Sequence, residues 1–266
     1  MLTRRNLLAA ATLAAATPAL SRPVPGLEDI DFNDPAQNLH QIMRVFGDAA
    51  GGDVLYWFHG WIYAMIPGRR PFPLVHFNGI NAMRFTRRPD GAYQSRHHSM
   101  SFIEDPVTQQ LLDSFQNPIT GKTNSPKPNV FNGSEYEYAP AGTRMMRGNA
   151  SSITPFHPGM WSFGAGHAWL TIDRPYSEAF GYPWAEARTY MVSLADLKNP
   201  AITSLSNTQH STVTNPFPKW MEMPDAAGFA LWQANGRKLS SVSDLPAFLQ
   251  ERCERYMPQL KDYDVF

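Results

Sequence analysis

The 266-residue sequence contains one cysteine, Cys253, and no excess of charge of either sign. A single cysteine cannot form an intramolecular disulfide, and it excludes iron–sulfur clusters and cysteine-rich zinc sites. The 23 basic residues balance 23 acidic ones. Nothing therefore attracts this surface to nucleic acid or to an anionic membrane, and neither is an expected partner of the exported chain.

The common catalytic and cofactor motifs are also missing. Ser162 stands one residue too late for the G-x-S-x-G elbow of serine hydrolases, and G-A-G at 164–166 lacks the third glycine of a dinucleotide fingerprint. The eight histidines form neither H-E-x-x-H nor H-x-H, although a metal site assembled from distant residues, such as His167 with Glu178, stays open as an alternative. We expect no cofactor and no metal ion.

The N-terminus has the pattern of a twin-arginine export signal. Arg4 and Arg5 precede an apolar run, and A-L-S at 19–21 offers small residues to a signal peptidase. A helix of the folded domain is the alternative, but the run is too short to span a bilayer and prolines follow it. We predict a signal over residues 1–21, a single β-rich domain over 22–266, and a periplasmic location.

Composition favours strands joined by shaped turns. The chain has 23 prolines, 18 glycines and 12% aromatic residues. A helix is predicted over 35–47 behind Asp34, and a last helix behind Ser243 or Asp244 carries an apolar stripe that places Cys253 in the core. Long ordered loops are predicted over 121–160. Strands are predicted at 54–66, 72–86, 92–104, 111–116, 167–172, 186–193, 210–214 and 228–234.

These elements predict a mainly β fold. The expected architecture is an antiparallel, barrel-like sheet of the lipocalin or calycin type, with a short helix near each end. A closed barrel would hide the edges of the sheet and enclose a ligand pocket. An α+β sandwich is the alternative.

Two similar turn sequences lie in the middle of the chain, D-P-V-T at 105–108 and N-P-I-T-G at 117–121. The Asp or Asn side chain can bond the backbone ahead, Pro fixes φ, and Gly121 permits the chain to leave the turn. We interpret the repeat as architecture rather than as a site.

The strand predicted at 72–86 carries polar groups among apolar ones. His76, Asn78 and Arg84 share one face by the two-residue period, and Asn81 lies on the other. A ligand cavity would be lined in this way, and so would a half-exposed sheet face. We predict that His76 moves a proton, that Arg84 binds an anion or phenolate, and that Asn78 and Asn81 contact the substrate.

Glu186, Arg188 and Tyr190 also alternate along one strand. Buried, this line would support proton transfer by Tyr190 with Glu186 at the substrate, whereas an exposed, salt-bridged face is the alternative. Two tryptophans complete the predicted site. Trp220 is expected to pack on a ring of the substrate, and Trp57 is expected to contact it.

Several landmarks resemble the domain-of-unknown-function 1838 family. They are the paired turns, Gly60 and Tyr63 in FHGWIY, the G-x-N-x-x-R segment at 79–84, and W-M-x-M at 220–223. The likeness extends from about residue 35 to about residue 260, and the 122–160 segment departs from the family pattern. The resemblance implies corresponding positions but no catalytic roles.

We therefore predict a cofactor-independent periplasmic enzyme of lyase or isomerase type. It would use general acid/base chemistry on a small apolar or aromatic, oxygenated compound. A non-catalytic carrier of a similar hydrophobic ligand would use the same pocket, and an aromatic protein-docking surface is a third interpretation. The oligomeric state is not indicated.

Overall fold

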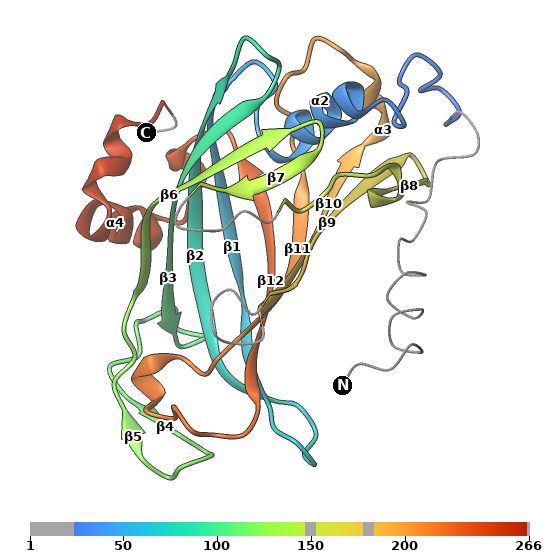
Figure 1. Cartoon of the computed structure of the whole chain (residues 1–266). Coiled ribbons are helices and arrows are strands. Elements are labelled where there is room, and N and C mark those ends of the chain that lie inside the picture. Colours follow the sequence, from blue (N-terminus) through green and yellow to red (C-terminus); the bar gives the residue numbers. More distant parts are fainter. Residues whose placement is uncertain (1–23, 147–152, 178–183, 265–266) are drawn as a thin grey trace, which may run out of the picture.

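The computed structural model describes residues 24–146, 153–177 and 184–264, so the predicted export signal and Glu178 lie outside the described residues. Ten strands form one antiparallel sheet in the order β7-β6-β3-β2-β1-β12-β11-β10-β9-β8. The sheet curls until its two arms face one another, with α2 at one end between them (Figure 1). The prediction of a mainly β, barrel-like fold is confirmed.

The elements have the following bounds. The helices are α2 Pro35–Phe46, α3 Leu194–Lys198 and α4 Ala247–Tyr256, and the short 3-10 helices are η1 Pro158–Met160, η3 Lys219–Met221, η4 Val242–Asp244 and η5 Pro258–Asp262. The large sheet contains β1 Gly52–Met65, β2 Phe72–Arg87, β3 Tyr93–Glu104, β6 Asn129–Ala139, β7 Gly142–Met145, β8 Trp161–Gly164, β9 His167–Ser177, β10 Trp184–Ser193, β11 Thr208–Asn215 and β12 Phe229–Leu239. A separate small hairpin contains β4 Phe115–Gln116 and β5 Thr123–Asn124.

The inner face of the curled sheet packs around α2. The helix begins as predicted, because the Asp34 side chain accepts hydrogen bonds from the backbone N–H groups of the first turn. Its C-terminal residue Phe46 contacts the rings of Tyr138 on one arm and Tyr190 on the other. One core cluster therefore joins α2 to strands from both arms.

The outer face of β1, β2 and β3 is covered by α4 and η5 (Figure 1). Leu55 and Phe102 pack against Leu249 and Cys253 of α4 there, and the Cys253 thiol is fully buried. Burial raises the pKa of this thiol to about 12. The prediction that Cys253 belongs to the core is confirmed.

The two similar turns fold alike. In each copy the first side chain, Asp105 or Asn117, accepts hydrogen bonds from the backbone N–H groups two and three residues ahead. The fifth residue of each copy is left-handed, with φ 59° at Gln109 and 72° at Gly121, and its N–H donates to the carbonyl of the first. The interpretation as turns is confirmed, while the strand predicted at 111–116 contracts to β4.

The prediction of loops over 121–160 is wrong. This segment contains β6, an 11-residue strand paired with β3, and the edge strand β7. The Asn132-Gly133 pair bends the strand instead of ending it: the register shifts between His97 and His98, and Gly133 takes φ 72°. Glycine, asparagine and serine in this segment therefore mark a bulged strand near a sheet edge.

The last helix also begins later than predicted. Asp244 accepts hydrogen bonds from the backbone N–H groups of Ser240 and Ser241, so it closes the short turn η4 instead of capping a longer helix. Pro246 then precedes α4 as its flanking residue. No helix in the described part of the chain is long and apolar enough to cross a membrane.

Candidate functional site

A cavity of about 40 Å³ lies on the inner face, beside the end of α2 and between the two arms of the sheet. Its lining residues are Phe46, His97, Tyr136, Tyr138, Thr143, Ile172, Glu186, Arg188 and Tyr190. Such a volume holds about three water molecules. The cavity therefore has room for a small polar group but not for an aromatic ring.

Three cavity residues come from alternate positions of β10. The curl of the sheet turns their shared face inward, so Glu186 is 6% exposed, Tyr190 is fully buried, and Arg188 is half-buried between them. Of the two sequence interpretations, the buried line is the one observed. It combines a carboxylate, a guanidinium and a phenol in one wall.

The neighbours of Arg188 favour its charged form. Burial disfavours the positive charge of Arg188, but the Glu186 carboxylate, the Tyr190 hydroxyl and Tyr136 outweigh burial and raise the pKa of Arg188 above its usual value. The Arg188 Nε atom forms an ion pair with Glu186. Arg188 therefore carries a fixed positive charge beside the Tyr190 hydroxyl.

The opposite wall of the cavity comes from β3 and β6. The His97 Nε2 atom lies 2.7 Å from the Ser95 hydroxyl and 3.5 Å from the Tyr138 hydroxyl, and the His97 ring packs on Tyr136 at 4.6 Å. We did not predict His97, Tyr136 or Tyr138 as site residues. The two tyrosines lie on β6, which was predicted as loop, whereas His97 lies on β3, a strand that was predicted but not connected with a site. The signal for the tyrosines was their alternation at 136 and 138.

Two further polar residues lie on the inner face outside the cavity lining. Asn81 is 8% exposed, and its Oδ1 atom has no hydrogen-bond partner among the described residues. Lys238 donates from Nζ to the Gly47 carbonyl at 2.8 Å, which closes the C-terminal end of α2. Burial lowers the pKa of Lys238 to about 7, against an opposing effect of Asp48.

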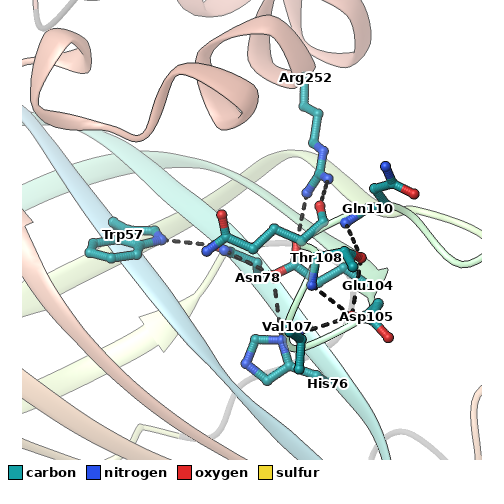
Figure 2. A network of polar contacts seen from close by, with 10 residues as sticks. Trp57, His76, Asn78, Glu104, Asp105, Val107, Thr108, Gln110 and Arg252 are labelled. Carbon is teal, nitrogen blue, oxygen red and sulfur yellow. Dashed lines mark hydrogen bonds and ion pairs between the residues drawn. The ribbon is translucent and has the colours of Figure 1, made fainter.

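The predicted residues His76, Asn78 and Trp57 lie together on the outer face, around a carboxylate that was not predicted (Figure 2). Glu104 is fully buried and receives hydrogen bonds from Arg252 at 2.7 Å and from Asn78 at 3.1 Å. The His76 Nδ1 atom lies 3.4 Å from the same carboxylate, and the Trp57 indole donates to Asn78 at 2.8 Å. These contacts link β1, β2, β3 and α4.

The environment of Glu104 favours its charged form. Burial raises the pKa of Glu104, but the nearby His76 imidazole, the hydrogen bonds from Arg252 and Asn78, and the Arg252 charge outweigh burial and lower it below the usual value. Glu104 is therefore an anion held in place by three neighbours.

Arg84 lies on the same outer face as His76, as predicted, but the two side chains have different neighbours. Eight residues of extended strand separate the two, or roughly 26 Å. The Arg84 guanidinium donates to the Asp53 carboxylate at 2.7 Å and packs over the Tyr263 ring at 4.7 Å. The hydrogen bond to Asp53 raises the pKa of Arg84 despite some burial. Arg84 thus holds the C-terminal segment against β2.

The structure divides the predicted site residues into four places. Trp220 lies in η3, where its ring contacts Phe115 at 5.6 Å within a third core cluster. The inner face holds Tyr190, Glu186 and Asn81, the outer network holds Trp57, His76 and Asn78, and Arg84 and Trp220 each stand apart. Among the described residues, no group of three or more His, Cys, Asp or Glu side chains could hold a metal ion.

Comparison with known proteins identifies the family. The family described as "Protein of unknown function (DUF1838)" matches residues 51–141 and 171–264, which is most of the chain. The chain belongs to the DUF1838 family. The match extends through β6 and leaves unmatched the segment with β7, η1 and β8. No curated protein matches the chain.

One solved structure is similar only at a very low level. It is described as "Crystal structure of MucB in complex with MucA(peri)", with 12% sequence identity over 84% of this chain and 96% of that chain, and a TM-score of 0.12. This likeness carries no argument about the DUF1838 fold or its function.

Some DUF1838 landmarks have a packing explanation. A Cβ atom at Gly79 would lie 2.2 Å from the Met100 carbonyl oxygen and 2.7 Å from the Phe58 ring. A Cβ atom at Gly60 would overlap the Gln233 carbonyl oxygen of β12. These glycines let neighbouring strands approach closely and leave room for the Phe58 ring on the inner face.

Proposed function

We propose that this DUF1838 protein is a cofactor-independent acid/base enzyme whose reacting centre is the inner cavity. The observation that carries the proposal is the buried line Glu186, Arg188 and Tyr190 facing the cavity beside His97. A proton-transferring hydroxyl, a fixed cation and an imidazole within one small cavity are the groups that general acid/base catalysis needs. Isomerisation or elimination requires no further reagent, so a lyase or isomerase is the reaction class.

Each cavity residue has a proposed role. The Tyr190 hydroxyl transfers a proton to or from the substrate, and Arg188 stabilises the negative charge that develops on the substrate oxygen. Glu186 positions Arg188 through their ion pair. His97, on the facing wall, exchanges the second proton, with the Ser95 and Tyr138 hydroxyls orienting its ring.

The lining favours a small apolar or aromatic, oxygenated compound. Phe46, Ile172 and the tyrosine rings supply apolar walls, while Arg188 and the hydroxyls recognise oxygen. Since the cavity measures only about 40 Å³, the oxygen-bearing end of the substrate enters it and the remainder packs along the inner face. The apolar run behind Arg4 and Arg5 supports a periplasmic location for this activity.

The test is turnover of a panel of small phenols, aromatic ketones and unsaturated lactones, followed by absorbance and mass spectrometry. Tyr190→Phe and Arg188→Met are expected to lower kcat at least about 100-fold, the usual size of an acid/base or oxyanion contribution. His210→Asn, at an exposed position on the outer face of the sheet, is the matched control and should leave kcat unchanged. Wild-type turnover by the Tyr190→Phe variant would contradict the proposal that the reaction takes place in the inner cavity.

A non-catalytic carrier of the same class of ligand is the second candidate. The observation that favours it is the aromatic lining from Phe46, Tyr136 and Tyr138, which suits binding as well as chemistry. A carrier would bind members of the panel without consuming them, and Tyr190→Phe would alter affinity alone. Isothermal titration calorimetry measures binding and the turnover assay measures consumption of the same compounds. Together they distinguish a carrier from an enzyme.

A further inference from the structure

Two histidines lie side by side on the outer face, away from the proposed reacting centre. His59 of β1 and His76 of β2 are diagonal neighbours, because His59 pairs with Asn78, and their ring centres are 6.0 Å apart. Both side chains are half-buried. His59 has no hydrogen-bond partner in the described part of the chain, so its ring nitrogens are available to a ligand.

A buried carboxylate orients the second histidine. Glu104 lies 3.4 Å from the Nδ1 atom of His76 and is itself fixed by Arg252 and Asn78 (Figure 2). An anion at this position favours the tautomer with hydrogen on Nδ1 and leaves the Nε2 lone pair free. Carboxylate, histidine and metal ion in this order are the usual arrangement of a metal-binding histidine and its supporting group.

The ring spacing fits a shared ion. With metal–nitrogen bonds of about 2.0–2.1 Å, the ring centres of two imidazoles on one tetrahedral ion lie roughly 5 Å apart. The observed 6.0 Å is about 1 Å longer than this value, so sharing an ion requires the two rings to rotate toward one another. Imidazole nitrogen is a preferred ligand of copper, nickel and zinc.

We propose that His59 and His76 bind a divalent late transition-metal ion, Cu²⁺ most tightly, with Glu104 supporting His76. No third His, Cys, Asp or Glu ligand joins them among the described residues, so water completes the coordination. A site with two protein ligands exchanges its ion readily, which suits transient metal binding at an exported surface rather than a structural ion. The order of affinity should follow Cu²⁺ above Ni²⁺ and Zn²⁺.

Neighbouring indoles provide a direct readout. The Trp57 ring stacks on His59 at 5.4 Å, and the Trp61 ring meets the edge of His76 at 5.4 Å. Titration of untagged protein with copper chloride should therefore quench tryptophan fluorescence with one-site behaviour. Calorimetry of the same titration should give one ion per chain at the tightest site.

His59→Asn and His76→Asn should each weaken Cu²⁺ binding at least tenfold and abolish the quenching at low copper. His210→Asn is the matched control, because His210 is an exposed histidine nearby in the same sheet that contacts Asn235. It should leave affinity unchanged. Wild-type Cu²⁺ affinity in His59→Asn would overturn the proposal. So would a loss of affinity in His210→Asn as large as in His59→Asn, because the ion would then bind at several surface histidines instead of at one site.

Glu104→Gln tests the supporting role. Loss of a supporting carboxylate typically weakens metal binding about 10- to 100-fold. Circular dichroism must first show that the variant is folded, because Arg252 loses its anionic partner. Wild-type affinity in folded Glu104→Gln would exclude the role of Glu104, while the two asparagine variants test the site without disturbing that buried pair.

Discussion

Arg252 in α4 donates a hydrogen bond of 2.7 Å to Glu104 at the end of β3, across 148 positions of the chain. Its second terminal nitrogen donates to the Gln109 carbonyl at 2.6 Å, within the first of the two similar turns. One guanidinium therefore ties the last helix, the sheet and a turn together. The same carboxylate contacts His76, so this structural link also orients a side chain at the outer face.

Arg252→Ala should destabilise the protein strongly. It leaves the fully buried Glu104 carboxylate without its cationic partner, and breaking a buried pair from one side costs about 3–5 kcal/mol. Urea unfolding followed by circular dichroism measures the change. Arg88→Ala is the control: Arg88 pairs with Asp90, whose side chain is 52% exposed, and with Glu137, so we expect a loss of at most about 1 kcal/mol. Similar losses in both variants would contradict a special role for Arg252.

The two similar turns should respond oppositely to substitution at their fifth residue. Gln109 is left-handed at φ 59° and exposed, so Gln109→Gly should stabilise the protein by up to about 1 kcal/mol. Gly121 has a left-handed backbone conformation with φ 72°, and an added Cβ atom would contact no neighbouring atom. Gly121→Ala should therefore lower the free energy of unfolding by about 1 kcal/mol through backbone strain alone. Thermal melts of both variants test this, and a loss in Gln109→Gly would show that the Gln109 side chain has a role of its own.

Lys238 should make stability rise with pH in the alkaline range. Its pKa is about 7 in the folded protein against 10.5 unfolded, so the unfolded chain binds more protons between these values. Stability therefore increases as pH rises from about 7 toward 10.5. Lys238→Met should flatten this dependence in melts recorded across the range, while Lys122→Met, at an exposed position, should not. An unchanged slope in Lys238→Met would show that its ammonium is solvated.

Local periodicity predicted much of this protein. The two-residue period correctly grouped Glu186, Arg188 and Tyr190 on one strand face, and likewise His76 with Arg84 on another. A shared face did not imply a shared site for His76 and Arg84, because a 16-residue strand places its ends far apart. Periodicity states which way side chains point along a strand, not how far apart they lie.

The failures came from segments whose partners are distant in sequence. β6 was predicted as loop because glycine, asparagine and serine disfavour an isolated strand, whereas pairing with β3 and the bulge at Gly133 stabilise it in the fold. That error concealed Tyr136 and Tyr138, and with them one wall of the cavity. Glu104 was overlooked because its partner Arg252 lies 148 residues away.

The sequence by itself determined strands β1–β3 and β9–β12, the two turns, the start of α2 and the buried position of Cys253, because each depends mainly on neighbours within a few residues. Only the tertiary structure decided which face of the sheet is inner and which is outer. The curl that makes this choice arises from all ten strands together and from α2 packing between the two arms. It brings Tyr190 against Phe46, and it leaves His59 and His76 on the opposite face of the sheet.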